Sequence, residues 1–116
     1  MMDNQLSYRR LQAYQVAKEA AAICVANQRL FVGLAGEVHS QLHRAMNSVL
    51  LNIIEGTGRW SKADQQRFYK IACGSATEVM GCLEIAELHG VEQRVLDEIG
   101  GRIIRVVQML MALIRR

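Results

Sequence analysis

Two histidines stand one helical turn apart and could share a metal ion. His39 and His43 have the spacing that places two imidazoles on one face of a helix. The sequence offers no third ligand beside them, and the Glu-x-x-His motif of carboxylate-bridged metal bundles does not occur. We therefore predict no metal site and no cofactor.

Other catalytic patterns find no better support. The cysteines Cys24, Cys73 and Cys82 form no CxxC pair, and neither they nor the serines have a recognisable base partner. The pair Gly56-x-Gly58 is too short for a phosphate-binding loop, and no predicted strand precedes it. The sequence therefore predicts a protein that is not an enzyme.

Basic side chains around a single tryptophan form the first candidate site. Such a surface with an exposed aromatic ring can hold phosphates and stack a base. The candidate nucleic-acid-binding residues are Arg9, Arg10, Arg59, Trp60, Lys62, Arg67, Arg115 and Arg116. Two other roles remain open: the last two arginines suit a helix C-terminus, and Trp60 could pack on the end of the fold.

A polar stripe forms the second candidate site. Its members recur at three- and four-residue steps, as on one face of a helix. They are Gln41, Arg44, Ser48, Asn52 and Glu55, with Ser75 and Glu78 as partners from the following helix. Arg44 is expected to reach Glu78 or Ser75. The stripe is either a structural network that fixes helix register or a contact for a ligand or subunit.

Composition limits the fold that must position these groups. The 116 residues are 51% hydrophobic and contain no proline, which favours a single all-α domain. The richest apolar run, Ile103–Ile114, includes Arg105 and Gln108 and is shorter than the roughly 20 residues that a membrane span needs. Unpaired cysteines and a polar start that does not resemble a signal peptide predict a cytoplasmic protein without membrane contact.

Hydrophobic periodicity predicts four helices over residues 7–27, 36–55, 62–88 and 91–114. Their short connections favour one antiparallel up-down-up-down bundle over residues 1–116. Ser7 and Ser61 are expected to cap helix starts, and Gly90 to follow a helix end. Gly56 or Gly58 is expected to stop the second helix in a left-handed conformation. Residues 27–36 are expected to form an irregular connection.

The third and fourth helices have recognisable inner faces. For residues 62–88 this face is Phe68, Ile71, Ala72, Ser75, Val79, Cys82, Leu83 and Ala86. For residues 91–114 it is Val95, Ile99, Ile103, Val106, Leu110 and Leu113. The last helix has more apolar residues than one inner stripe needs, which indicates self-association. The candidate oligomer interface is Ile104, Val107, Met111 and Ile114.

An antiparallel bundle would gather the basic residues at one end. Both termini and the turn at residues 56–61 would lie there, with seven basic residues against Asp3, Glu55 and Asp64, a net charge of +4. We therefore predict an oligomer that binds RNA or DNA through the backbone phosphates. The alternative is a protein-interaction scaffold that presents a groove to a partner helix and binds no nucleic acid.

The turn Asn52-x-x-Glu55-Gly56-x-Gly58-Arg59, with flanking matches over residues 8–114, resembles the 23S rRNA-intervening-sequence protein family. The resemblance implies a four-helix bundle, a ring-shaped homo-oligomer (a pentamer in known relatives) and no established enzymatic activity. Some relatives are encoded within large-subunit rRNA genes, and a related bundle binds nucleic acid and a reverse transcriptase. This sequence departs from the pattern at residues 27–36, which lack the usual proline and charged residues.

Overall fold

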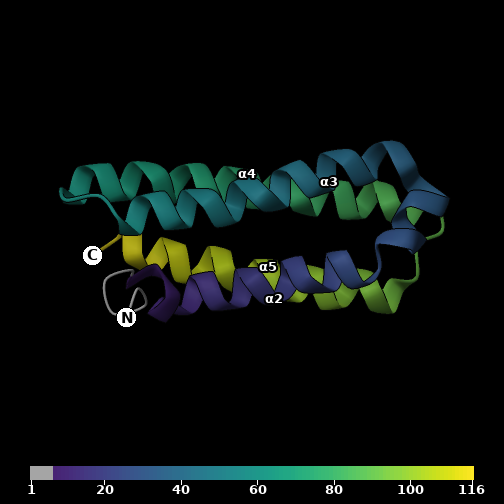
Figure 1. Ribbon diagram of the computed structural model, residues 1–116, viewed down its shortest axis with the longest axis horizontal. Coiled ribbons are helices and arrows are strands. Elements are labelled where there is room, and N and C mark those ends of the chain that lie inside the picture. Colours follow the sequence, from purple (N-terminus) through teal and green to yellow (C-terminus); the bar gives the residue numbers. More distant parts are fainter. Residues whose placement is uncertain (1–6) are drawn as a thin grey trace.

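The chain folds into four long helices preceded by one short 3₁₀ helix (Figure 1). The computed structural model describes residues 7–116, except the side chain of Ser7. The elements are η1 (Ser7–Arg10), α2 (Gln12–Ala26), α3 (Gln28–Thr57), α4 (Lys62–Leu88) and α5 (Gln93–Ile114). No strand occurs among the described residues. The predicted all-α class is therefore confirmed.

Side-chain contacts show the relative direction of α3 and α4. Thr57 Oγ1 lies 3.1 Å from the Tyr69 hydroxyl, and Ser48 Oγ lies 2.7 Å from Ser75 Oγ. Thr57, late in α3, thus faces Tyr69, early in α4. Ser48, earlier in α3, faces Ser75, later in α4. These two helices therefore run in opposite directions along their shared interface.

The end of α5 returns to the beginning of α4. Gln66 Nε2 donates a hydrogen bond of 2.6 Å to the backbone oxygen of Ile114. An ion pair of 3.2 Å between Arg102 Nε and Glu19 Oε1 joins α5 to α2. Figure 1 shows η1, the turn between α3 and α4 and the end of α5 at the same end of the molecule. Three segments distant in sequence therefore converge.

The core runs along the centre of the bundle and is apolar. Burial of each large aliphatic side chain stabilises the fold by about 1.5–3 kcal/mol. The largest fully buried side chains are Phe31, Leu42, Val49, Ile53, Val79, Val95, Ile99, Ile103, Val106 and Leu110. The inner face expected for the last helix is confirmed except at Leu113, which is half-buried.

The inner face of α4 differs from the prediction. Ile71 is 43% exposed and Phe68 is only half-buried, whereas Tyr69 and Ala76 are buried. The reason is steric, because the Tyr69 ring packs into the space that the missing side chain of Gly56 leaves on α3. The helix therefore turns Tyr69, rather than Ile71, toward the core.

The expected irregular connection at residues 27–36 is mostly helical. α3 begins at Gln28 and continues to a kink at Ala35, whose backbone (φ −146°, ψ 56°) is not helical. Asn27 Nδ2 donates to the Ile23 backbone oxygen at 2.8 Å and bridges the junction with α2. Phe31 is fully buried, so its packing holds this segment against the bundle despite its glycines.

Two expected helix ends have different outcomes. Ser7 begins η1 instead of capping the first long helix, which follows Leu11 without a side-chain cap, so that prediction is wrong. Gly90 has φ 89° as expected, and the backbone nitrogen of Val91 donates to the oxygen of Ala86 at 3.1 Å. That bond closes the Schellman motif that ends α4.

Candidate nucleic-acid interface

The end of α3 is shaped by contact with α4 and not by a left-handed glycine. Among the described residues only Gly90 has a positive φ, and Gly58 has φ −82°, so the expected left-handed stop at Gly56 or Gly58 is wrong. A Cβ on Gly56 would lie 2.7 Å from Tyr69 Cε1. Gly56 is therefore needed for a close approach of two helices, which brings the turn tightly onto α4.

The turn from Gly58 to Ser61 is held at both ends. The expected cap is confirmed, because the backbone nitrogen of Asp64 donates to Ser61 Oγ at 3.1 Å. Gln65 Nε2 donates to the backbone oxygen of Arg59 at 2.9 Å. Trp60, between these anchors, is 100% exposed. The possible packing of Trp60 on the bundle end is thus excluded, since the ring projects into solvent from a fixed turn.

Two arginines flank an aromatic ring next to this turn. The guanidinium carbons of Arg59 and Arg67 lie 4.6 and 4.4 Å from the centre of the Phe68 ring. Arg59 Nη2 also pairs with Glu55 Oε2 at 2.8 Å, and Arg67 Nε lies 3.7 Å from Asp64 Oδ1. Both guanidinium groups are therefore positioned before any ligand arrives, while their side chains stay 42% and 59% exposed.

The remaining predicted cations surround the same end of the molecule. Lys62 opens α4, Arg115 and Arg116 follow α5, and all three are exposed. Arg9 and Arg10 belong to η1, which Figure 1 places at this end. Of the acids counted from the sequence, Asp3 lies outside the described residues, and Glu55 and Asp64 pair with the arginines above. We call this group of basic residues with Trp60 the basic end.

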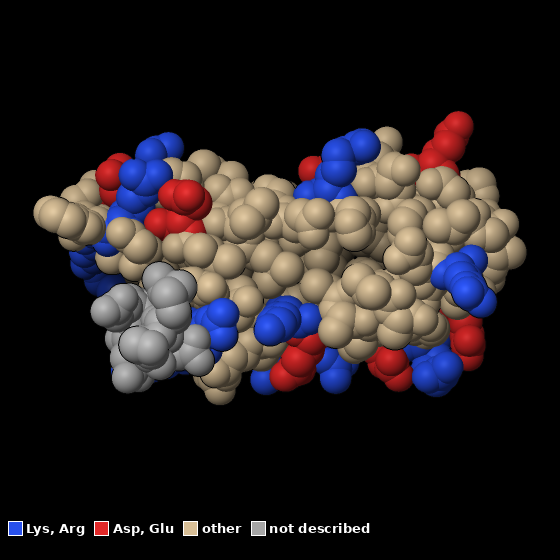
Figure 2. Space-filling view, in the orientation of Figure 1, with Lys and Arg blue, Asp and Glu red and all other residues tan. Residues whose placement is uncertain are grey.

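The basic surface extends further than the sequence analysis proposed. α5 packs beside α2, and Lys18 and Arg105 on these helices are exposed. Figure 2 shows Lys and Arg side chains continuing from this end along the lower edge of the molecule, with acidic side chains between them. The sequence could have indicated that basic residues extend along α5, because no acidic residue follows Glu98.

The opposite end of the bundle is acidic. It carries the end of α4 and the beginning of α5, with the exposed or half-buried acids Glu84, Glu87, Glu92, Asp97 and Glu98. Arg94 pairs there with two of these carboxylates, each at 3.3 Å. Among the described residues, acids therefore outnumber lysines and arginines at this end, in contrast to the basic end.

The predicted polar stripe forms a smaller network than expected. Ser48 and Ser75 share the 2.7 Å hydrogen bond between α3 and α4, and Asn52 Nδ2 donates to the backbone oxygen and Oγ of Ser48 at 2.8 and 3.1 Å. Glu55 binds Arg59 instead of joining this group. Gln41 is exposed and lines a surface cleft. The three linked side chains are placed to fix the register of the two helices.

Arg44 and Glu78 do not form the expected pair. Within residues 7–116 no hydrogen bond or ion pair joins them, and both side chains are exposed. They lie near Cys82, whose thiol pKa is raised by burial and by the charge of Glu78, while the charge of Arg44 lowers it. An exposed pair gains little from contact, because water screens both charges and the side chains lose rotamer freedom.

Two thiols are shielded by burial, and two histidines pack against each other. Burial raises the pKa of the Cys24 thiol to about 12 and also raises the pKa of Cys73, so both are protonated at neutral pH. His39 and His43 stack with ring centres 6.0 Å apart. Among the described residues no three potential metal ligands cluster together. The two thiols are therefore held in their neutral form, and the two histidines form a stacked pair.

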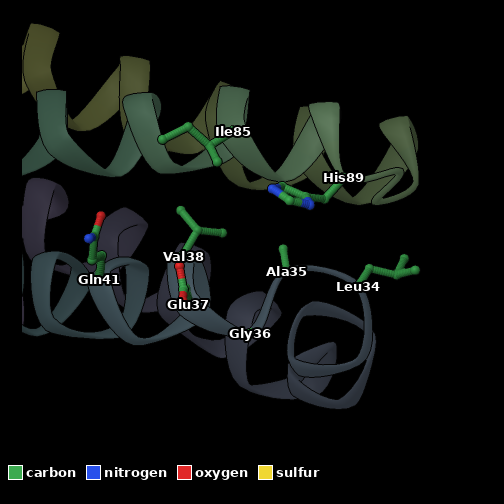
Figure 3. Close-up of a pocket in the computed structure, with 8 residues that line it drawn as sticks. All are labelled: Leu34, Ala35, Gly36, Glu37, Val38, Gln41, Ile85 and His89. Carbon is green, nitrogen blue, oxygen red and sulfur yellow. The ribbon is translucent and has the colours of Figure 1, made fainter.

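A cleft of about 280 Å³ lies beside the kink in α3 (Figure 3). Figure 3 shows Val38 and Ile85 facing one another across it and the His89 ring reaching in from the end of α4. Glu37 also lines the cleft, but in the described part of the chain no hydrogen bond joins it to His89.

The hydropathy of the helices and comparisons with known proteins add three findings. None of the helices in the described part of the chain is long and apolar enough to cross a membrane. The family model for the 23S rRNA-intervening sequence protein matches residues 9–112, and the resemblance inferred from the sequence is thereby confirmed. No curated protein matches the chain.

Proposed function

Because the chain belongs to the 23S rRNA-intervening sequence protein family, we propose that it is a non-catalytic, self-associating bundle that binds the nucleic-acid backbone through its basic end. The observation that supports this role is the convergence of cations from three distant segments: η1, the turn after α3 and the end of α5. The family consists of small helical proteins and is not a known enzyme family, which favours a binding role over a catalytic one.

Phosphate binding explains why these cations surround one surface. Each phosphate neutralised by a lysine or arginine releases condensed counterions, so affinity falls steeply as salt rises. Lys62 and the C-terminal arginines are exposed, whereas Arg59 and Arg67 have carboxylate neighbours. The backbone contacts do not depend on base identity, so RNA and DNA are both suitable.

Charge reversal at Lys62 tests this role. Lys62→Glu with Arg116→Glu should weaken binding of a structured RNA and reduce the slope of affinity against salt, measured by mobility shift at low and raised salt. Arg29→Glu with Arg94→Glu is the matched control, because both arginines are exposed at the opposite end and their replacement changes the charge equally. Equal affinities for all three proteins, or no binding by the unaltered protein at low salt, would refute the role.

Self-association is proposed through the second half of α5. Ile104 is 49% and Met111 38% exposed, and Val107 and Ile114 beside them are half-buried. Burying these side chains against another copy would remove apolar surface from water, and the family resemblance favours five copies in a ring. Light scattering should show an oligomer that Ile104→Glu disrupts. A monomer at micromolar concentration would contradict this part of the proposal.

A specific observation also favours the alternative, a protein-interaction scaffold. Leu88 is 83% exposed at the acidic end of the bundle, and Val25, Val32 and Leu34 at the same end are also exposed. Exposed aliphatic groups beside acids suit a basic amphipathic segment of a partner protein. Capture of a partner after nuclease treatment, lost in Leu88→Glu, together with an absence of nucleic-acid binding, would favour this alternative.

A further inference from the structure

Trp60 is exposed in a way that the fold itself does not require. Tryptophan is highly buried on average, yet this ring is 100% exposed and the described bundle packs without it. Its exposure does not come from an open loop, because the cap at Ser61 and the hydrogen bond from Gln65 to Arg59 hold the turn on both sides. A large aromatic ring is thus fixed in position and fully available to a ligand.

The charged groups beside this ring favour one chemical class of ligand. Arg59 precedes it and Lys62 follows shortly after, so cationic groups flank the indole along the chain. Arg59 also lies over Phe68, and guanidinium groups themselves provide surfaces on which bases stack. An aromatic ring between cations matches a ligand that alternates flat rings with negative charges, which is the chemistry of a nucleic-acid strand.

We propose that the basic end selects unpaired nucleotides, one base stacking on Trp60 while the adjacent phosphates contact Arg59 and Lys62. This inference rests on the proposed nucleic-acid binding and specifies its substrate class. Bases inside a duplex are already stacked on their neighbours, so their faces are closed to an indole. Single strands, loops and bulges of RNA, and single-stranded DNA, present open faces and share this chemistry.

The chain contains one tryptophan, so its fluorescence reports on the proposed contact directly. The experiment titrates the full chain with a mixed-sequence single-stranded RNA, the same sequence as DNA, and the blunt duplex of each. Labelled-strand anisotropy measures affinity, and tryptophan emission is recorded in parallel. Both single strands should quench Trp60 at the concentrations at which they bind, whereas the duplexes should quench it weakly. If only the RNA strand or only the DNA strand quenches Trp60, that result identifies which nucleic acid the site binds.

Four variants separate stacking from charge. Trp60→Ala and Trp60→Leu should each lose about 10- to 100-fold in affinity for single strands, the loss expected for one stacked base, with little change for duplexes. Trp60→Phe should retain most of the affinity, because it keeps an aromatic face. The salt slope should stay unchanged in Trp60→Ala, since stacking releases no counterions, whereas Lys62→Glu should reduce that slope.

The outcomes distinguish this inference from the proposed function. Equal binding of strands and duplexes, unaffected by Trp60→Ala, would overturn the selection of unpaired nucleotides and leave backbone binding intact. An absence of binding to every probe at low salt would overturn both. A change of oligomeric state in Trp60→Ala, with RNA affinity unchanged, would assign the ring to a protein interface and overturn the inference. Because Trp60 is fully exposed, circular dichroism should show all variants folded.

Discussion

Replacement of Gly56 by alanine should destabilise the bundle, although alanine is normally the better helix residue. A Cβ at this position would lie 2.7 and 2.8 Å from Tyr69 Cε1 and Cδ1, and 3.2 Å from the backbone oxygen of Gln65. Carbon atoms in contact prefer about 3.5–4 Å, so the ring would have to move by roughly 0.8 Å. Tyr69 is only 6% exposed, and its hydroxyl is 3.1 Å from Thr57 Oγ1, so it has little room to yield.

The expected loss follows from three contributions. Overpacking of a core costs about 1–3 kcal/mol, and loss of the Tyr69 hydrogen bond adds about 1 kcal/mol. The higher helix propensity of alanine offsets about 1 kcal/mol of this sum. We therefore expect Gly56→Ala to lower the free energy of unfolding by about 1–3 kcal/mol, and Tm by roughly 4–12 °C for a chain of this length.

Urea denaturation followed by circular dichroism measures this change against matched controls. Gly74→Ala and Gly81→Ala, inside α4 with open space around the added methyl group, should stabilise the protein by about 0.5–1 kcal/mol. In a Tyr69→Leu background the cost of Gly56→Ala should largely disappear, because the ring that it contacts is absent. A Gly56→Ala protein as stable as the two controls would refute the steric reasoning.

Three further predictions concern pH, the hydroxyl pair and the exposed charges. The Cys24 pKa of about 12 lies above its ordinary value of 9.0, so the unfolded chain releases this proton first, and stability should fall by about 1.4 kcal/mol per pH unit as pH rises from 9 toward 12. Denaturation across that pH range should show a shallower fall in Cys24→Ala; an identical slope would contradict the assignment. Ser48→Ala and Ser75→Ala should each lower the free energy of unfolding by about 1 kcal/mol, because each leaves the other hydroxyl without its partner. The double variant removes both hydroxyls, so its loss should be smaller than the sum of the two single losses. Additive costs in a double-mutant cycle would show that the bond contributes nothing. Arg44→Ala and Glu78→Ala should each change the free energy of unfolding by less than about 0.5 kcal/mol, since both are exposed; a loss above about 2 kcal/mol in thermal melts would indicate a missed contact.

The polar stripe shows where sequence reasoning reached its limit. Periodicity correctly placed its members on one side of α3, and Ser48 does meet Ser75 and is held by Asn52. It could not distinguish an exposed Arg44 from a buried one. Long side chains near the boundary of two helices can enter the interface or extend into solvent, and the choice depends on the distance between the helices. The small serines lie where the helices approach closely, and the longer charged groups stay outside.

The basic end shows the opposite case. The sequence predicted that its cations would converge, because short turns force neighbouring helices to run in opposite directions. Figure 1 shows the segments that carry them, η1, the turn between α3 and α4 and the end of α5, at the same end of the molecule. The exposure of Trp60 was left open by the sequence, since an apolar ring could equally have packed on the end of the bundle. The capped turn holds the ring away from the core and thereby decides the question.

The sequence by itself determined the helices, the cap at Ser61 and the stop at Gly90, because hydrophobic periodicity, capping hydroxyls and positive φ are local properties of the chain. The tertiary structure decided the helical course of residues 28–34, the role of Gly56 and the reach of Arg44. Each of these depends on a residue distant in sequence: the core around Phe31, the ring of Tyr69 and the separation of α3 from α4. Local patterns fix where helices form, whereas the contact of one helix with another fixes what its side chains can touch.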